Sequence, residues 1–250
     1  MTGALATAAA AKPVVTALGG SFMISSEAKA AGKEHGYRGW QLYLAGRAGV
    51  LGEVSAEVVH ATLGFHHPDL VRTGWEAGRE VAPLDETVTR YVEVCRSWGR
   101  RRYADLPSAE ADRLATLLER VSRAADPAGW PLFAAWRAQP LADDAPGRVV
   151  QLLHVLREHR GGAHLAAVRQ AGLTPLEAIV AGAGGAANAT FFGWPDPLPP
   201  ASDDLRQRLA RAEQATDELV APAYAALSAD EQAELPHLLG AAAAAARRAA

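Results

Sequence analysis

Residues 108–125, with the sequence SAEADRLATLLERVSRAA, decide the fold class. The arginine and glutamate residues of this stretch fall on one side of an α-helix, and the apolar residues fall on the other side. The apolar side consists of Leu114, Leu117, Leu118 and Val121. Residues 148–159 repeat the pattern, and strand patterns are nearly absent from the chain. The sequence therefore predicts an all-α protein.

Capping residues predict where several helices begin. Thr174-Pro175-Leu176-Glu177 combines an N-cap threonine, a first-turn proline and a glutamate that can reach back to the cap amide. Ser228-Ala229-Asp230-Glu231 is a second capping box, and Ser202 opens a long amphipathic helix that runs to about Leu227. The proline-rich run 193–200 cannot be helical throughout, so we expect a stiff linker there.

Composition excludes several classes of protein. The 250 residues are 49% hydrophobic and 21% charged, which allows a buried core. The net charge of −3 excludes a chain that is basic overall. The single cysteine, Cys95, excludes an intrachain disulfide and a zinc site built from several thiolates. No apolar stretch reaches the about 20 residues of a membrane span, and the first residues lack the basic segment of a signal peptide. We therefore expect a cytoplasmic protein without membrane contact.

The helix breakers suggest how the chain is organised. We expect a disordered N-terminus over residues 1–12, an N-terminal helical half over 13–145, a C-terminal helical half over 146–240 and a fraying tail over 241–250. Both halves carry apolar helix faces that need partners, so we expect them to share one core.

The most polar short segment is 154–164, HVLREHRGGAH. Its three histidines recur every five residues, so they do not share a helix face and do not form a metal-binding pair. Gly161 and Gly162 predict the end of the helix, where cations are favoured by the helix dipole alone. The alternative is a pocket in which these side chains bind an anion or move a proton. The candidate residues are Arg157, His159, Arg160 and His164.

A second candidate segment is 36–49, GYRGWQLYLAGRAG. Tyr43 and Arg47 are four residues apart and share a helix face. If this face points inward, Arg47 needs either a carboxylate of the chain or an anionic ligand. We place Trp40, Tyr43 and Arg47 among the candidate substrate-binding residues.

A third candidate segment, 64–70, contains adjacent histidines before a helix start at Pro68. Pro68 pushes His67 into an extended conformation. Neighbouring histidines point in different directions, so at most one of them faces a given pocket. We take His67 as a third candidate catalytic histidine beside His159 and His164; the alternative is a hydrogen-bonded structural role.

Several motifs occur in one order along the chain, at residues 39–54, 65–68, 129–135, 156–164 and 171–173. In this order the chain resembles the actinobacterial SalK-like family, whose members are catalogued as MarR-like helix-turn-helix proteins. The resemblance covers residues 38–239 and implies degenerate winged-helix modules that share a core. It also implies a truncated C-terminal module, because only residues 195–202 stand where the family carries a recognition helix and a wing.

Two functions from different classes are compatible with these patterns. The first is a cofactor-free and metal-free enzyme of secondary (natural-product) metabolism that binds an anionic small molecule through arginines. Its reaction would be an elimination or an intramolecular cyclisation that releases an oxyanion such as sulfate or phosphate. The alternative is a MarR-like transcriptional regulator, although the negative net charge and the truncated module argue against specific DNA binding. A helical scaffold without a site is the third possibility.

The long helix from Ser202 also suggests a partner. Its apolar stripe would lose its cover if the C-terminal module is truncated, and an uncovered stripe usually marks a binding surface. We therefore expect a homodimer, or a heteromer with a related helical protein, through this helix and residues 191–194. The alternative is that the N-terminal half covers the stripe. The stripe consists of Leu205, Leu209, Ala212 and Leu219.

Overall fold

The structure is a computed structural model that describes residues 3–249, and every regular element among them is a helix. This confirms the prediction of an all-α fold. Short 3-10 helices occupy Phe22–Ile24 and Gly49–Leu51. The α-helices are α1 (Gly3–Ser21), α2 (Ser26–Glu34), α3 (Gln41–Ala48), α4 (Ala56–Leu63), α5 (Pro68–Arg79), α6 (Leu84–Arg102), α7 (Ser108–Ala124), α8 (Pro131–Arg137), α9 (Ala145–Gln170), α10 (Pro175–Ala181), α11 (Gly185–Phe191), α12 (Asp203–Tyr224) and α13 (Ala229–Arg248).

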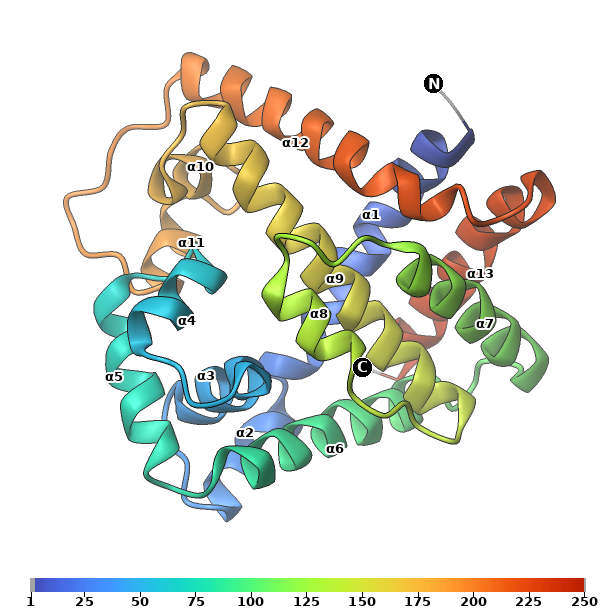
Figure 1. The fold of residues 1–250 in the computed structure, drawn as a ribbon, viewed down its shortest axis with the longest axis horizontal. Coiled ribbons are helices and arrows are strands. Elements are labelled where there is room, and N and C mark those ends of the chain that lie inside the picture. The colour runs from blue at the N-terminus through green and yellow to red at the C-terminus, as the bar shows by residue number, and fades with distance from the viewer. Residues whose placement is uncertain (1–2, 250) are drawn as a thin grey trace.

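Helix α9 is the central element. It crosses the middle of the molecule in Figure 1 and packs against α1, α6, α7, α8 and α12. Consecutive residues from Val149 to Leu156 are buried, so this part of α9 is enclosed on all sides, as expected of a core helix. The main hydrophobic core extends from Ala8 to Ala246 and continues across residue 145. Residue 145 is therefore the start of the central helix and does not separate two cores.

Both predicted disordered ends are wrong for the residues that the structure describes. Residues 3–12 form the first turns of α1, in which Thr7, Ala8 and Ala11 are buried. Residues 241–248 continue α13, in which Ala242 and Ala245 are fully buried. Each end of the chain is held in a helix by the other, because α1 packs on α13. The small alanine side chains let these two helices approach closely. Residues 1, 2 and 250 lie outside the described part of the chain.

Segment Gly3–Glu34 is long and apolar enough, by length and composition, to cross a membrane, which the sequence analysis did not anticipate. The 3-10 helix Phe22–Ile24 interrupts it, and α1 packs against α9, α12 and α13. Ala8, Ala11 and Val15 of α1 belong to the main hydrophobic core.

The three predicted N-caps are confirmed. The side chain of Ser202 accepts a hydrogen bond from the Leu205 amide, and Thr174 and Ser228 each form a complete capping box with the glutamate three residues on. The predicted uncovered stripe on α12 is wrong. Ala212 is 1% exposed, and Leu205 and Leu209 pack on a small cluster with α9 and α10 residues. Leu219 stays exposed. The argument for a dimer that rested on an uncovered stripe therefore no longer applies, and the dimer remains a prediction.

Helix α9 does not end at Gly161-Gly162, as the two glycines predicted, but continues to Gln170. Glycine is required here for packing. A Cβ atom at Gly162 would lie 2.8 Å from Cε3 of Trp130, so the indole ring can rest against the helix only because that atom is missing. His159 and Arg160 consequently lie in the middle of α9.

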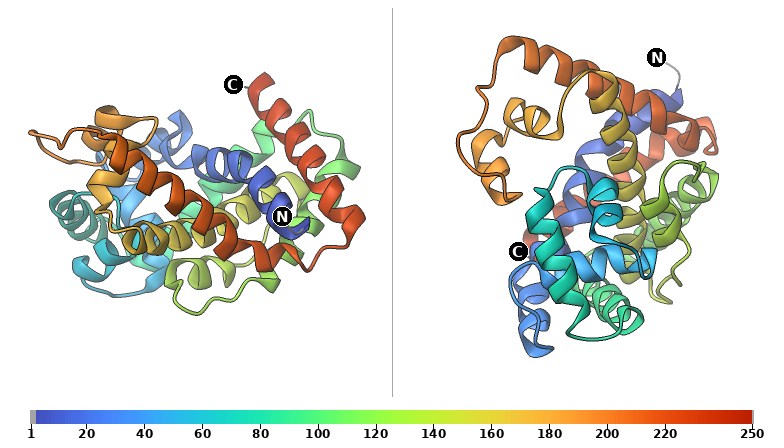
Figure 2. Two further views of the ribbon diagram at one scale, coloured as in Figure 1. Left: turned by 90° about the horizontal axis from the view of Figure 1, so that it is seen from above. Right: turned by 60° about the vertical axis from the view of Figure 1, so that its left-hand side comes forward.

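Residues 175–194, which include α10 and α11, form a unit that we call the cap. Its own small core contains Ile179, Val180 and Ala189. The cap is joined to the turn between α4 and α5, residues 64–67, by two hydrogen bonds. The Trp194 indole donates to the Phe65 carbonyl over 2.9 Å, and the His67 amide donates to the Phe192 carbonyl over 2.8 Å. After the cap, residues 194–202 contain no helix, as the prolines predicted, and this loop projects from one end of the molecule in Figure 2.

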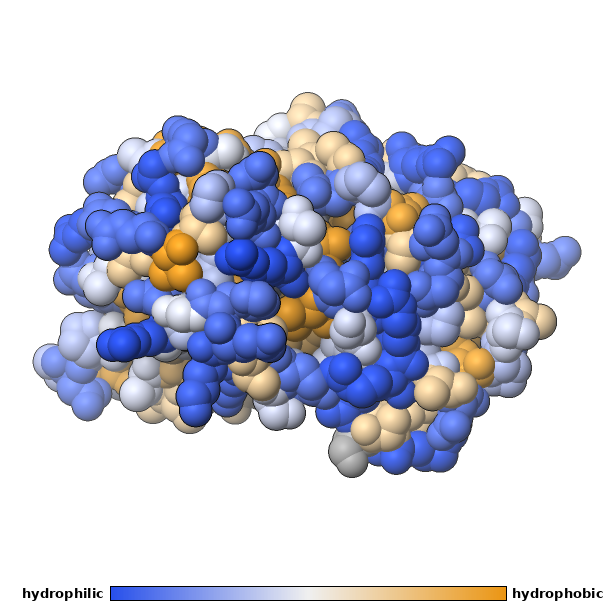
Figure 3. Space-filling model, turned by 90° about the horizontal axis from the view of Figure 1, so that it is seen from below, coloured by the Kyte–Doolittle hydropathy of each residue, from blue (hydrophilic) through white to orange (hydrophobic). Residues whose placement is uncertain are grey.

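The face of the molecule drawn in Figure 3 is mostly hydrophilic. Figure 3 shows one face on which hydrophobic residues form small separate spots among polar ones. Among residues 3–249, the exposed large apolar side chains are widely separated along the chain: Ile24, Val58, Phe191 and Leu219.

Candidate functional site

A cavity of about 740 Å³ lies between α3, α4, α8, α9, α12 and the cap. Its volume is in the range of small-molecule sites. Most of the wall is apolar, and charged side chains gather at two places along it. The principal apolar residues are Leu63, Phe65, Trp130, Phe133, Ile179 and Leu209.

The first charged group is built on Arg47 and Glu158. The Nε and Nη2 atoms of Arg47 donate to the two Glu158 carboxylate oxygens over 3.0 and 2.8 Å. Nη1 of Arg47 donates to the Tyr43 hydroxyl, so the predicted shared face of Tyr43 and Arg47 is confirmed. Burial favours the neutral form of Glu158, but Arg47 and then Arg157 outweigh it and lower the Glu158 pKa to about 2.

Arg157 adds a second positive charge to this group. Its Nη1 atom donates to Oε1 of Glu158 over 3.0 Å, and its side chain is 28% exposed. Two guanidinium groups therefore share one carboxylate, and no other acidic side chain of the described residues forms an ion pair with either. His154, whose Nδ1 lies 3.6 Å from the same carboxylate oxygen, is kept neutral because burial lowers its pKa to about 4. One positive charge stays unbalanced at the cavity wall.

The second charged group is balanced. Arg160 donates to Asp217 over 2.6 Å and to Glu213 over 3.1 Å, and Lys12 also pairs with Glu213. Two cations thus meet two carboxylates. Arg160, predicted to bind substrate, is instead bound by two acidic residues of α12, and the alternative of a helix-end cation does not apply because α9 continues to Gln170. Arg169 lies at the rim of the cavity without an ion pair among the described residues.

Of the three predicted catalytic histidines, only His164 lines the cavity. Its Nδ1 atom is hydrogen-bonded to the Thr216 hydroxyl over 3.0 Å, and its Nε2 atom lies 3.8 Å from Glu213. Burial lowers the pKa of His164, and this effect exceeds the opposing effect of the Glu213 charge. The ring is therefore neutral.

His159 and His67 are not part of the cavity wall, and the predictions that placed them in a pocket are wrong. His159 packs on Phe133 with ring centroids 4.7 Å apart, and burial followed by the charge of Arg137 lowers its pKa to about 4. The His67 side chain instead caps α5 by accepting a hydrogen bond from the Asp69 amide over 3.3 Å. Trp40 packs on Tyr43 behind the wall and does not reach the cavity.

His66, the neighbour that the sequence analysis did not choose, does line the cavity. It is 2% exposed, and neither ring nitrogen has a hydrogen-bond partner. Its ring is enclosed by Trp40, Tyr43 and Phe192, at centroid distances of 5.9, 5.4 and 4.8 Å. Burial, and after it the charges of Arg47 and Arg157, lower the His66 pKa to about 3.

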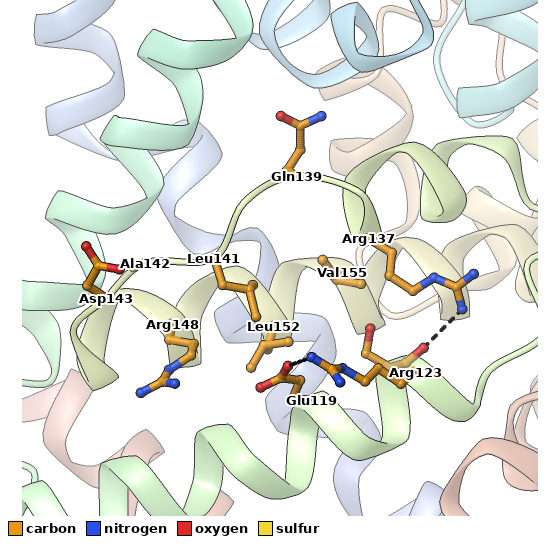
Figure 4. Close-up of a pocket in the computed structure, with 11 residues that line it drawn as sticks. Glu119, Arg123, Arg137, Gln139, Leu141, Ala142, Asp143, Arg148, Leu152 and Val155 are labelled. Carbon is orange, nitrogen blue, oxygen red and sulfur yellow. Dashed lines mark hydrogen bonds and ion pairs between the residues drawn. The ribbon is translucent and has the colours of Figure 1, made fainter.

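A second hollow, of about 540 Å³, lies between α7, α9 and residues 137–143. Figure 4 shows that its three arginines do not converge. Arg123 pairs with Glu119, and Arg137 donates to the carbonyl oxygens of Ser122 and Ala125. Arg148 points away from both. The hollow therefore offers no clamp for an anion.

Among residues 3–249, no group of three or more metal-ligating side chains is placed to hold a metal ion. The sequence analysis also missed the acidic partners Glu158, Glu213 and Asp217. Glu158 stood inside the polar segment, and a carboxylate for Arg47 was expected, but pairing two residues 111 positions apart requires the fold.

Helices α4 and α5 are joined by a short turn of the kind found in helix-turn-helix pairs. They pack on each other and are joined by the four residues 64–67, which begin with a glycine at φ 68°. The second helix would be the reading element, but its exposed arginines are internally paired, Arg72 with Asp69 and Arg79 with Glu53. With Glu76 also exposed, α5 presents no positive face. No strand that could form a wing exists in the part of the chain that the structure describes.

Comparison with known proteins gives one match. A family described as a helix-turn-helix family matches residues 8–250. No curated protein matches the chain, and no solved structure does.

Proposed function

The chain belongs to a helix-turn-helix family, and we propose that it works as a small-molecule enzyme through its cavity and not through DNA. The observation that carries this proposal is the unbalanced positive charge of Arg47, Arg157 and Glu158 at the wall of an apolar cavity. A partly desolvated cation without a counterion is costly, and an anionic ligand would remove that cost. The ligand class is a mainly apolar molecule that carries a carboxylate, sulfate or phosphate.

The same arrangement suits the cofactor-free reaction proposed from the sequence. A nucleophilic N–H or O–H group of the substrate would attack the carbon that bears the anionic group. The new bond to that carbon forms as its C–O bond breaks, and the oxyanion leaves with the electron pair. Arg157 and the Tyr43–Arg47 pair would stabilise the departing oxyanion. The proton of the nucleophile would pass to a neutral histidine of the wall, where both the sequence-predicted His164 and His66 lie.

Binding can be tested with 2-naphthoate and its neutral counterpart 2-naphthamide, which differ in charge and little in shape. We expect 2-naphthoate to bind at least about tenfold more tightly, because a charge-assisted hydrogen bond contributes about 1.5–3 kcal/mol. The preference should vanish in Arg157→Gln. Arg160→Gln is the matched control on the same helix, and it should keep the preference because Arg160 is already balanced. Isothermal titration calorimetry of both ligands with the unchanged protein and the two variants measures all six combinations.

Turnover needs its own test. The purified chain would be incubated with alkyl sulfates that carry an amine on the adjacent carbon. Enzymatic release of inorganic sulfate that depends on Arg157 supports the enzyme. Tight, charge-dependent binding without release of inorganic sulfate would contradict the enzyme and indicate that the cavity is a sensor site.

The regulator is the second candidate because the family is a helix-turn-helix family. In that case the cavity would bind an effector, and the finer likeness to SalK-like and MarR-like proteins would extend to function. The internally paired arginines of α5 argue against it. DNA binding that is sequence-specific and changes with an aromatic acid would decide for the regulator.

A further inference from the structure

His66 is a buried histidine whose presence the fold alone does not explain. Both ring nitrogens are covered and without hydrogen-bond partners. A buried polar group that lacks a partner lowers the stability of the folded protein, so a leucine at this position would make a more stable protein. Groups that lower stability in this way concentrate at functional sites.

The position of His66 connects it with the cavity. The residue lies in the turn between α4 and α5 and lines the same cavity as Arg47, Arg157 and Glu158. Its ring centroid lies 5.4 Å from that of Tyr43, whose hydroxyl accepts a hydrogen bond from Arg47. His164, in contrast, already uses Nδ1 for Thr216 and stands beside the balanced group.

Access to His66 is controlled by the cap. Phe192 packs edge-on against the His66 ring, and its carbonyl accepts the neighbouring His67 amide. Outside the cap, Phe191 of α11 packs on Trp40 with ring centroids 4.9 Å apart, whereas α10 packs against α9 and α12. A movement of Phe192 would therefore uncover the imidazole without disturbing the main core.

We propose that His66 is a ligand-contacting residue of the cavity, covered by Phe192, which accepts the hydrogen bond and then the proton of an N–H or O–H group of the bound molecule. This rests on the proposed function and deepens it. The substrate is then an organic anion with a second, neutral polar group, and His66 is the proton acceptor in the displacement. The proton moves to a ring nitrogen as the nucleophile forms its new bond, so charge and atoms balance.

A stability measurement tests the first half of the argument in the full chain. His66→Leu removes two unpaired nitrogens, so we expect an unchanged or higher Tm. The matched control is His154→Leu on α9, where Nδ1 is paired with the Gly19 carbonyl over 3.1 Å. That variant should lower Tm by a few degrees. A clear loss of stability in His66→Leu would make His66 a structural residue and overturn the proposal.

A binding measurement tests the second half. The probes are 2-naphthoate and the set of its hydroxy derivatives with the hydroxyl at each ring position. We expect at least one isomer to bind about fivefold or more tightly than 2-naphthoate, and this gain to disappear in His66→Leu. The affinity of 2-naphthoate itself should change less than twofold in that variant.

The two proposals fail in different ways. If 2-naphthoate binds no better than 2-naphthamide, the anion site is wrong and the proposed function falls. If 2-naphthoate binds through Arg157 but no hydroxyl isomer gains affinity through His66, the anion site stands and the role of His66 is wrong.

Discussion

Glu158 is the residue on which the charged part of the cavity depends. Glutamine at this position keeps the shape but removes the charge that holds Arg47 and Arg157. Removing one partner of a buried ion pair costs about 3–5 kcal/mol, because the remaining charge is left buried. Arg47 is 8% exposed at its side chain, so this case applies. We expect Glu158→Gln to lower the free energy of unfolding by that amount in urea titrations.

Glu213→Gln is the matched control for this prediction. The Glu213 side chain is 35% exposed, and its partner Arg160 keeps Asp217. Water screens such a pair, so the loss should stay below about 1 kcal/mol. Equal losses in the two variants would contradict the distinction between a buried charged group and a balanced, partly exposed one.

Buried histidines set the response of stability to pH. Burial lowers the pKa of His154 and His159 from 6.5 to about 4 and that of His66 to about 3. Each ring is neutral in the folded protein and takes up a proton on unfolding below pH 6.5. Stability is therefore complete above pH 6.5 and falls as the pH drops towards 4. Each histidine contributes a slope of about 1.4 kcal/mol per pH unit at most in this range.

Urea unfolding at pH 7, 6 and 5 measures this slope. His159→Phe should make it shallower, since one of the three contributions is gone. The Glu158 carboxylate affects stability only at lower pH. Its pKa falls from 4.5 to about 2 on folding, so its contribution to the free energy of unfolding disappears between these pH values. A free energy of unfolding that stays constant from pH 7 to pH 5 would show that these rings are protonated in the folded protein.

At the scale of helices, capping residues close together in the sequence predict where helices begin. Contacts between residues far apart in the sequence are not predicted. The starts of α10, α12 and α13 follow from caps formed within four residues. Gly161-Gly162 misled the prediction because Trp130, which explains Gly162, comes from α8. For the site, the sequence indicated Arg47, Tyr43 and Arg157, but it could not tell that His66 rather than His67 faces the cavity. That choice depends on how α5 is capped.

The two adjacent glycines of α9 should respond in opposite ways to alanine. A Cβ atom at Gly161 meets nothing within 4 Å, so Gly161→Ala should raise the free energy of unfolding by about 0.5–1 kcal/mol, the usual difference in a helix interior. At Gly162 the new atom would press on Trp130, so Gly162→Ala should be destabilising and should reduce 2-naphthoate binding. Thermal unfolding of both variants compares them directly. Equal gains would mean that Trp130 moves freely.

For the whole molecule, the helix-turn-helix family and the surface charge lead to different expectations about DNA. The family match covers residues 8–250, yet the chain has a net charge of −3 and the arginines of α5 are paired within the protein. Affinity for DNA comes mainly from cations that neutralise phosphates. An arginine that is paired with a carboxylate must break that ion pair before it can bind a phosphate, so each phosphate contact is weaker.

We therefore expect weak DNA binding without sequence preference, with a Kd no tighter than the about 10⁻⁴–10⁻⁶ M of non-specific complexes at physiological salt. Fluorescence anisotropy with random and promoter duplexes at 50 and 150 mM salt measures it. Asp69→Asn with Glu76→Gln removes acidic groups from the exposed side of α5 and should strengthen binding, whereas Arg72→Gln should change little because Arg72 is paired over 2.6 Å. A footprint on one promoter at 150 mM salt, lost in Arg72→Gln, would show that α5 reads DNA. The cavity would then be the effector site of a regulator.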